Sequence, residues 1–189
     1  MADPEILLVV TGMPGAGKDE FIGVCKEMGF TDLHMGDAVR KYAAMKNIEI
    51  SDVEIGRFAT SERSAYGMDI WARRTLIESR EKRIVIDRLR NYEELEYFQN
   101  ELGSERCYLI AIFANRRQRL ERIMKRNRSD DVHSLEELIS RDERELKWGI
   151  GKAIALSDIM MVNNTTLEHF RREARSVIRK ILKLPDDGI

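Results

Sequence analysis

The chain has 189 residues, 43% of them hydrophobic, which is enough to build one sizeable core. Its 32 basic and 33 acidic residues leave a net charge of −1, so the total charge gives no indication of a nucleic-acid or membrane partner. With three prolines and no linker-like stretch, we expect a single domain over residues 1–189. The two cysteines, Cys25 and Cys107, lie in apolar segments and are expected to be core residues in a reducing cytoplasm.

The first predicted element is a buried strand over residues 5–11. It is too short for a membrane helix and lacks the basic flank of a signal peptide, so we expect a cytoplasmic protein without membrane attachment. The glycine-rich turn that follows reads Gly12-Met13-Pro14-Gly15-Ala16-Gly17-Lys18. This spacing between a strand and a helix is typical of a loop that binds nucleoside triphosphate, with backbone N–H groups and the lysine facing the phosphates.

Asp19 follows the lysine where the common form of this loop has Ser or Thr, whose hydroxyl binds Mg²⁺. A loop of this form without that hydroxyl resembles the loop of adenylate kinase and its relatives. The resemblance implies bound ATP, with Mg²⁺ held mostly by phosphates and water. Asp19 could bind one of those waters, or its charge could repel the phosphates, and both roles stay open.

The second strand is predicted over residues 30–34, and a helix follows it at once. Its first residues, Gly36-Asp37-Ala38-Val39-Arg40, resemble a Gly-Asp-x-x-Arg segment of nucleoside monophosphate kinases. The resemblance implies that Asp37 and Arg40 serve the acceptor nucleotide, with Arg40 holding its phosphate. By chemistry alone, Asp37 could instead be a helix cap and Arg40 a solvated side chain.

Two helical stretches are predicted within residues 48–81, before the third strand. By analogy with nucleotide kinases this is the acceptor-binding flap, in which Arg63 is the candidate contact. Apolar side chains of the segment are expected to form its core rather than to bind the ligand: Ile55, Phe58, Ala59, Ile70 and Trp71.

The third strand, residues 83–87, ends in Asp87, at the end of a parallel sheet where ligands bind. The corresponding strand of adenylate kinase ends Asp-Gly-x-Pro-Arg, and this resemblance implies that Asp87 orients Mg²⁺-bound water while Arg90 grips the acceptor phosphate. Arg88 stands where glycine is usual, so Arg88 could be the phosphate ligand instead. A structural pairing of Asp87 with a neighbouring arginine is a further alternative.

The fourth strand is predicted over residues 107–114, and an arginine-rich helix follows. Arg122 and Arg126 lie one turn apart on one helix face and resemble the Arg-x-x-x-Arg of adenylate kinases, which implies contact with the donor base and the lid. The other arginines of this helix are expected to be solvated or paired with Glu121 and nearby acids: Arg116, Arg117 and Arg119.

A short helical lid is predicted over residues 129–148, with Arg141 available to close over the transferring phosphate. The alternative is a charged amphipathic helix with Arg–Glu pairs. The last strand, residues 158–163, is similar to the last-strand region of dephospho-coenzyme A kinases. A helix over residues 165–184 is expected to pack on the sheet.

Over nearly its whole length the chain resembles an archaeal family of P-loop nucleotide kinases related to adenylate kinase. The resemblance implies an α/β fold with five parallel strands in the order 2-3-1-4-5, flanked by helices. The core would comprise residues 1–47, 82–128 and 149–189. The implied reaction moves the γ-phosphoryl group of ATP to a nucleoside monophosphate, AMP or CMP first, or to a similar small phosphorylated acceptor. The catalytic side chains would be those of Lys18, Asp87, Arg122, Arg126 and Arg141.

Two other functions remain open from the sequence. A dephospho-coenzyme A kinase-like enzyme would phosphorylate a hydroxyl group, and Asp37 or Asp87 would be the candidate base. A nucleotide-dependent factor with slow ATPase activity would act on an RNA or protein partner, for which the basic stretch 116–128 is suited. The acceptor and the oligomeric state depend on pocket shape and surface, which the sequence leaves open.

Overall fold

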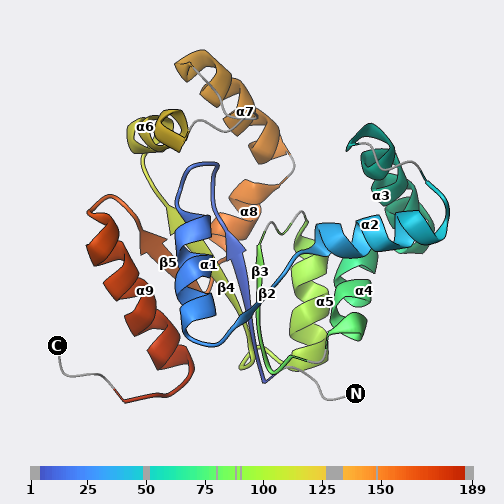
Figure 1. The fold of residues 1–189 in the computed structure, drawn as a ribbon, viewed down its shortest axis with the longest axis horizontal. Coiled ribbons are helices and arrows are strands. Elements are labelled where there is room, and N and C mark those ends of the chain that lie inside the picture. Colours follow the sequence, from blue (N-terminus) through green and yellow to red (C-terminus); the bar gives the residue numbers. More distant parts are fainter. Residues whose placement is uncertain are drawn as a thin grey trace.

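The structure, a computed structural model, describes residues 5–48, 52–79, 81–87, 89, 91–126, 134–147 and 149–185. Its centre is a parallel sheet with strand order β2-β3-β1-β4-β5, which confirms the predicted order (Figure 1). Each strand begins and ends within one or two residues of its predicted bounds. The strands are β1 (Ile6–Thr11), β2 (Thr31–Leu33), β3 (Arg83–Asp87), β4 (Cys107–Phe113) and β5 (Ile159–Val162).

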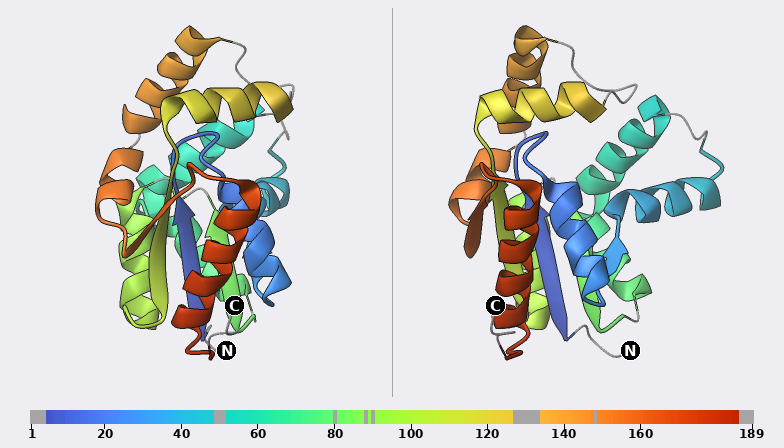
Figure 2. Two further views of the ribbon diagram at one scale, coloured as in Figure 1. Left: turned by 90° about the vertical axis from the view of Figure 1, so that its left-hand side faces the viewer. Right: turned by 60° about the vertical axis from the view of Figure 1, so that its left-hand side comes forward.

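Helices cover both faces of this sheet, as expected for a parallel sheet whose central strands are mainly apolar (Figure 2). On one face, α1 (Lys18–Glu27) and α9 (Leu167–Ile181) pack against Leu8 and Val10 of β1. On the other face, α5 (Tyr92–Leu102) and α8 (Ile150–Ala155) pack against the alternate side chains of the same strand, Leu7 and Val9. Both cysteines are buried, as predicted, and burial raises the pKa of each thiol.

The predicted C-terminal helix forms as α9, slightly shorter than residues 165–184. Thr166 begins it by accepting a hydrogen bond from the backbone N–H of His169, the usual role of an N-cap hydroxyl. Phe170, Ala174 and Ile178 face the sheet, whereas Leu167 is exposed. The helical spacing thus identified the buried face correctly, except at its first residue.

The predicted flap contains the two expected helices, α3 (Asp52–Tyr66) and α4 (Ile70–Glu78), and both pack with α2 (Met35–Met45). Trp71 is fully buried among them, with Phe58 and Tyr42 at edge-on angles to its ring. Ile70 is also buried, while Ile55 and Ala59 are partly buried against this cluster. The apolar residues of the flap are therefore core residues, as predicted, and α2 belongs to the same cluster.

Two helices lie beyond the carboxyl end of the sheet, next to the loop that follows β1 (Figure 1). They are α6 (Arg116–Arg126) and α7 (Leu135–Lys147), joined by apolar packing between Ile123 and Leu138. The segment predicted as a helical lid is thus helical where it is described. None of the helices in the described ranges combines the length and the apolar character needed to cross a bilayer.

Candidate phosphate site

The glycine-rich loop runs from the end of β1 to the start of α1, and its backbone is left-handed at three glycines. Two of them face neighbours so close that no side chain would fit. A Cβ on Gly12 (φ 144°) would lie 2.3 Å from the Ile112 carbonyl oxygen, and one on Gly17 (φ 109°) would lie 2.2 Å from Nδ2 of Asn163. The loop is therefore closely packed against the end of β4 on one side and against Asn163, which follows β5, on the other.

Donor side chains from distant parts of the chain hold the carbonyl groups of this loop. Asn163 Nδ2 donates to the Ala16 carbonyl at 2.9 Å, and Arg119 Nη1 donates to the Pro14 carbonyl at 3.1 Å. A trans peptide carries its C=O and N–H on opposite sides. The Pro14 and Ala16 carbonyl groups point toward α6 and Asn163, so the N–H groups of Gly15 and Gly17, in the same peptides, point the opposite way. Backbone N–H groups directed in this way before a helix N-terminus suit the binding of an anion.

Lys18 is the first residue of α1, and its ammonium group reaches back across the loop. Its Nζ atom donates a hydrogen bond of 2.8 Å to the Gly12 carbonyl oxygen. The cation therefore lies at the loop, among the residues predicted to bind the triphosphate. Asp19 is exposed in the first turn of the same helix. The predicted phosphate-loop residues, Gly12 to Asp19, thus form one loop and helix start.

Asp87 is the last residue of β3 and is almost completely buried. Its register partner in β1 is Val10, two residues before the loop begins at Gly12, so the carboxylate belongs to the strand beside the loop. Within the described residues, no three metal-binding side chains form a cluster. One carboxylate beside a phosphate loop fits Mg²⁺, which commonly keeps several waters and binds one or two carboxylates plus substrate phosphates. Arg88 and Arg90 lie outside the described residues.

Arg122 lies beside the loop and bonds only to neutral oxygens. Its Nη2 atom donates to the backbone carbonyl and to the Oδ1 atom of Asn163 at 2.8 and 3.2 Å, and its Nη1 atom is 3.4 Å from the Ala16 carbonyl. Among the described residues, no carboxylate forms an ion pair with it. Burial lowers its pKa, against the influence of Glu121, whose carboxylate is paired with Arg117. A positive charge therefore stands at the loop without a paired anion.

Arg119 is buried rather than solvated. The sequence predicts that it is solvated or paired with Glu121 and nearby acids, and its acid partner is Asp142 of α7, with two hydrogen bonds at 2.8 and 2.6 Å. Arg117 does pair with Glu121 and is exposed, as expected. The difference arises because Arg119 faces the loop and α7, whereas Arg117 faces solvent.

The remaining predicted donor-side residues lie on α6 and α7. Arg141 is partly buried on α7, next in sequence to Asp142. Arg126 is the last residue of α6, and its side chain lies outside the described part of the structure. These roles for Arg126 and Arg141 therefore stay predictions.

Three functional candidates were missed in the sequence: Arg119, Asp142 and Asn163. Asn163 directly follows β5, so the rule that ligands bind at the carboxyl ends of parallel strands was a signal that could have found it. No sequence signal joins Arg119 to Asp142, because both belong to helices rich in charged residues and lie 23 positions apart.

On the acceptor side, the two predicted cations that the structure describes, Arg40 and Arg63, bond to carboxylates. Arg40 bonds to Asp37 at 3.0 Å, and both side chains are exposed. Asp37 is not a helix cap, because α2 begins after His34 and Asp37 lies in its first turn. Arg63 bonds at 3.0 Å to Glu94, which is fully buried on α5. Arg63 therefore connects the flap to the core.

A second charged cluster of the flap was not predicted. Glu62 of α3 accepts hydrogen bonds from Lys46 and Arg74, each at 2.7 Å. Burial acts to raise the pKa of Glu62, but these two cations hold it below its ordinary value. The Arg74 guanidinium also lies over the rings of Tyr42 and Trp71, at 4.2 and 4.8 Å. The cluster binds the helices of the flap to one another.

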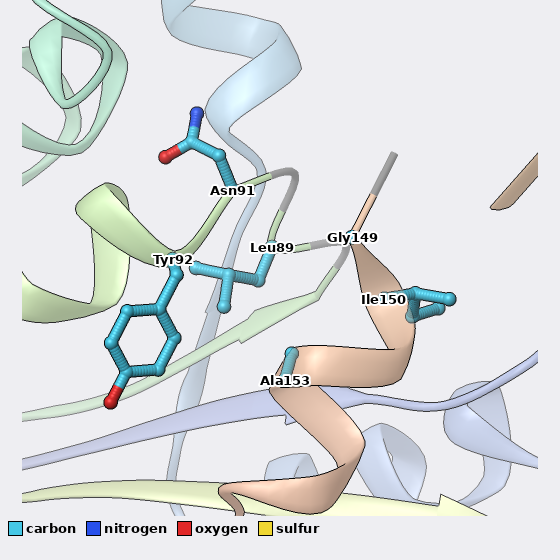
Figure 3. Close-up of a pocket in the computed structure, with 6 residues that line it drawn as sticks. All are labelled: Leu89, Asn91, Tyr92, Gly149, Ile150 and Ala153. Atoms are coloured by element: carbon cyan, nitrogen blue, oxygen red, sulfur yellow. The ribbon is translucent and has the colours of Figure 1, made fainter. Parts of the chain in front are cut away.

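A shallow pocket lies where the segment after β3 meets the start of α8 (Figure 3). Its cavity volume is about 10 Å³, far below the ~300–1,000 Å³ typical of ligand pockets. Most of its lining is apolar, and we assign it no ligand. The lining residues are Leu89, Asn91, Tyr92, Gly149, Ile150 and Ala153.

Comparison with known families places this geometry in context. A family described as "AAA domain" matches residues 11–139. The UPF0200 protein Ta0179 of Thermoplasma acidophilum is 57% identical over 173 residues, covering 91% of this chain and 94% of the relative. The UPF0200 protein Mbar_A0975 of Methanosarcina barkeri is 41% identical over 180 residues, covering 94% and 96%.

Solved structures share the fold at low sequence identity. Shikimate kinase from Acinetobacter baumannii, in complex with shikimate, has a TM-score of 0.57 at 15% identity, covering 94% of this chain and 93% of that one. Dephospho-CoA kinase from Campylobacter jejuni has a TM-score of 0.53 at 16% identity, covering 93% and 96%. The chain therefore belongs to the UPF0200 family, contains an AAA domain and has the fold of P-loop kinases.

Proposed function

We propose that this chain is an ATP-dependent kinase that transfers the γ-phosphoryl group to a nucleoside monophosphate or a similar small phosphorylated acceptor. The observation that carries the proposal is the unpaired charge of Arg122 beside a phosphate loop whose carbonyl groups are already held. Phosphoryl transfer requires mainly that the protein position two substrates and stabilise spreading negative charge. A preformed loop with two cations, Lys18 and Arg122, meets both needs.

On the donor side, the loop amides and Lys18 would bind the β- and γ-phosphates of ATP. Arg122 would stabilise the charge that develops as the bond between the γ-phosphorus and its bridging oxygen breaks and ADP leaves. Mg²⁺ would neutralise phosphate charge, held by Asp87 through water. Arg126 and Arg141 are proposed to approach the donor from α6 and α7.

On the acceptor side, an oxygen of the acceptor phosphate would attack the γ-phosphorus. An anionic phosphate needs no general base at neutral pH. Arg40 and Arg63 would hold the acceptor phosphate, together with Arg90 and with Asp37 as their polar neighbour. Both described arginines are bonded to carboxylates, so acceptor binding would have to exchange those partners for phosphate.

The test is ATP consumption with Mg²⁺ against AMP, CMP, UMP, GMP, dephospho-coenzyme A and no acceptor, with the phosphorylated product identified directly. We expect one monophosphate to stimulate turnover and to appear as its diphosphate. Stimulation by dephospho-coenzyme A alone would favour the enzyme named in one structural relative and would move the acceptor chemistry to a hydroxyl group.

A second candidate function is a nucleotide-dependent factor that turns ATP over slowly on an RNA or protein partner. Arg116 and Arg117 favour it, because both are exposed on α6 and would be accessible to a polyanion. Slow hydrolysis that ignores every small acceptor, together with steeply salt-dependent RNA binding, would support this function over the kinase.

A further inference from the structure

We propose that Arg119 and Asp142 are positioning residues for the donor nucleotide: Asp142 of α7 orients Arg119, and Arg119 fixes the Pro14 carbonyl of the phosphate loop. The inference rests on the proposed function only in taking ATP as the ligand of this loop. It assigns to α7 an effect on nucleotide affinity that is exerted through the loop backbone.

The contacts form a continuous chain from α7 through α6 to the loop. Arg119 Nη1 is shared between Asp142 Oδ1 at 2.8 Å and the Pro14 carbonyl at 3.1 Å, while Nη2 bonds to Asp142 Oδ2 at 2.6 Å. The two side chains are 5% and 4% exposed. A two-point contact with a carboxylate fixes the plane of a guanidinium, and here that plane determines where Nη1 points.

The loop is closely packed at the same place. Gly15 has φ of 77°, and a Cβ there would lie 2.9 Å from both the Arg119 carbonyl oxygen and the Ile123 side chain. The peptide that carries the Pro14 carbonyl also carries the Gly15 N–H on its opposite side. Fixing the carbonyl therefore orients an amide that we expect to face the phosphates.

Stability alone does not explain this pair. Replacing a buried ion pair by apolar residues of similar volume is often neutral or stabilising, so an ion pair is not needed simply to hold α6 against α7. Apolar packing already joins these helices through Ile123 and Leu138. What an apolar pair could not do is donate a hydrogen bond to the Pro14 carbonyl.

The arrangement implies reciprocal coupling between α7 and the nucleotide. If α7 moves away, Asp142 leaves Arg119 and the Pro14 peptide loses its fixed orientation. By linkage, a triphosphate that binds the oriented loop more tightly also favours the docked position of α7. The pair thus gives α7 an influence on the donor site that does not require it to touch the nucleotide.

The experiment measures ATP dissociation constants, without acceptor, together with thermal unfolding of the same proteins. The central variant is the double substitution Arg119→Met with Asp142→Leu in the full chain. We expect a melting temperature close to that of the unmodified protein but about tenfold weaker ATP binding, because the apolar pair packs and does not hold the carbonyl. Asp142→Leu alone should lower both, because it leaves a buried guanidinium unpaired.

Arg116→Met is the matched control, because its Nε atom lies 3.6 Å from Asp142 while its side chain is 56% exposed. ATP affinity should change less than about twofold in this variant. If the double variant does not fold, Arg119→Lys provides the second test: it keeps the charge next to Asp142 but not the two-point geometry, and it should also weaken ATP binding.

Wild-type ATP affinity in a folded double variant, or in Arg119→Lys, would overturn the inference. Binding is measured without phosphoryl transfer, so a protein that binds ATP but phosphorylates no acceptor would contradict the kinase proposal alone. A wild-type protein that does not bind ATP would overturn both.

Discussion

The donor loop and the flap use their cations differently. At the loop, Arg122 bonds to neutral oxygens, and side chains from α6 and the end of β5 hold the loop carbonyls in place. In the flap and around it, arginines bond to carboxylates, and two of the following four pairs join different helices. These pairs are Arg40 with Asp37, Arg63 with Glu94, Arg73 with Asp69, and Arg74 with Glu62.

This difference shows why the donor is easier to infer than the acceptor. A cation near neutral acceptors keeps most of its attraction for a phosphate, whereas a cation bonded to a carboxylate must first exchange that partner. Arg122, beside the loop, can therefore bind an anion without first giving up a carboxylate partner. The flap cations contribute to folding in the same positions where the acceptor would need them. The following substitutions test this contrast, beginning with the largest expected effect.

Lys18→Ala should reduce phosphoryl transfer by at least about 100-fold, because it removes a charge that we propose binds the phosphates of ATP. Its side chain donates to the Gly12 carbonyl, and thermal unfolding shows how much of any loss of activity comes from lost stability. Initial rates at saturating ATP, with thermal unfolding of the same sample, would measure this. Transfer that continues unchanged in the variant would remove the loop from the mechanism.

Arg122→Met should lower kcat/KM for ATP by about 10- to 100-fold, because it removes the unpaired charge beside the loop. Arg117→Met is the matched control on the same helix, since that side chain is exposed and paired with Glu121. We expect the control to leave kcat/KM within about twofold. Equal losses in the two variants would mean that only the general charge of α6 matters.

Arg63→Met should have two effects, because this arginine joins the flap to a buried carboxylate. We expect the free energy of unfolding to fall by about 1–3 kcal/mol, since a hydrogen bond to buried Glu94 is lost. If Arg63 also binds the acceptor, the KM for acceptor should rise about tenfold while the KM for ATP stays constant. Denaturant unfolding and steady-state kinetics would separate these effects. A stability loss without a change in acceptor KM would make Arg63 purely structural.

Arg40→Ala should have the smallest effect on stability, less than about 0.5 kcal/mol, because its pair with Asp37 is exposed. A role in acceptor binding would still raise the acceptor KM several-fold, since a guanidinium suits a phosphate. Comparison with Arg73→Ala, an exposed arginine paired with Asp69 on the same helix, gives the baseline for a cation without a proposed role. An unchanged acceptor KM in both variants would exclude Arg40 from the acceptor site.

Much of the fold was predictable from local patterns. The apolar run before Gly12, the glycine spacing and Lys18 are contiguous, and the strand-loop-helix unit they predict forms within those residues. The sheet-facing side of α9 followed from spacing, and the burial of Trp71 followed from the tendency of apolar side chains to form the core. Arg119 shows the limit of this approach, because it and Arg117 are equivalent by composition, yet one is buried against α7 and the other is solvated.

By itself the sequence determined the phosphate loop and the parallel sheet, because short-range steric rules and apolar periodicity act within neighbouring residues. The strand order was implied only by the resemblance to P-loop nucleotide kinases, and the tertiary structure confirms it. Only the tertiary structure decided which polar and charged groups bond to one another across the chain. The bond from Asn163 to Ala16 spans 147 positions, and the bond from Arg63 to Glu94 spans 31. Arginines on one helix cannot be told apart in the sequence, because their partners are carboxylates and carbonyl groups far away along the chain. The tertiary contacts therefore decide which arginines stabilise the fold and which are available to bind a phosphate.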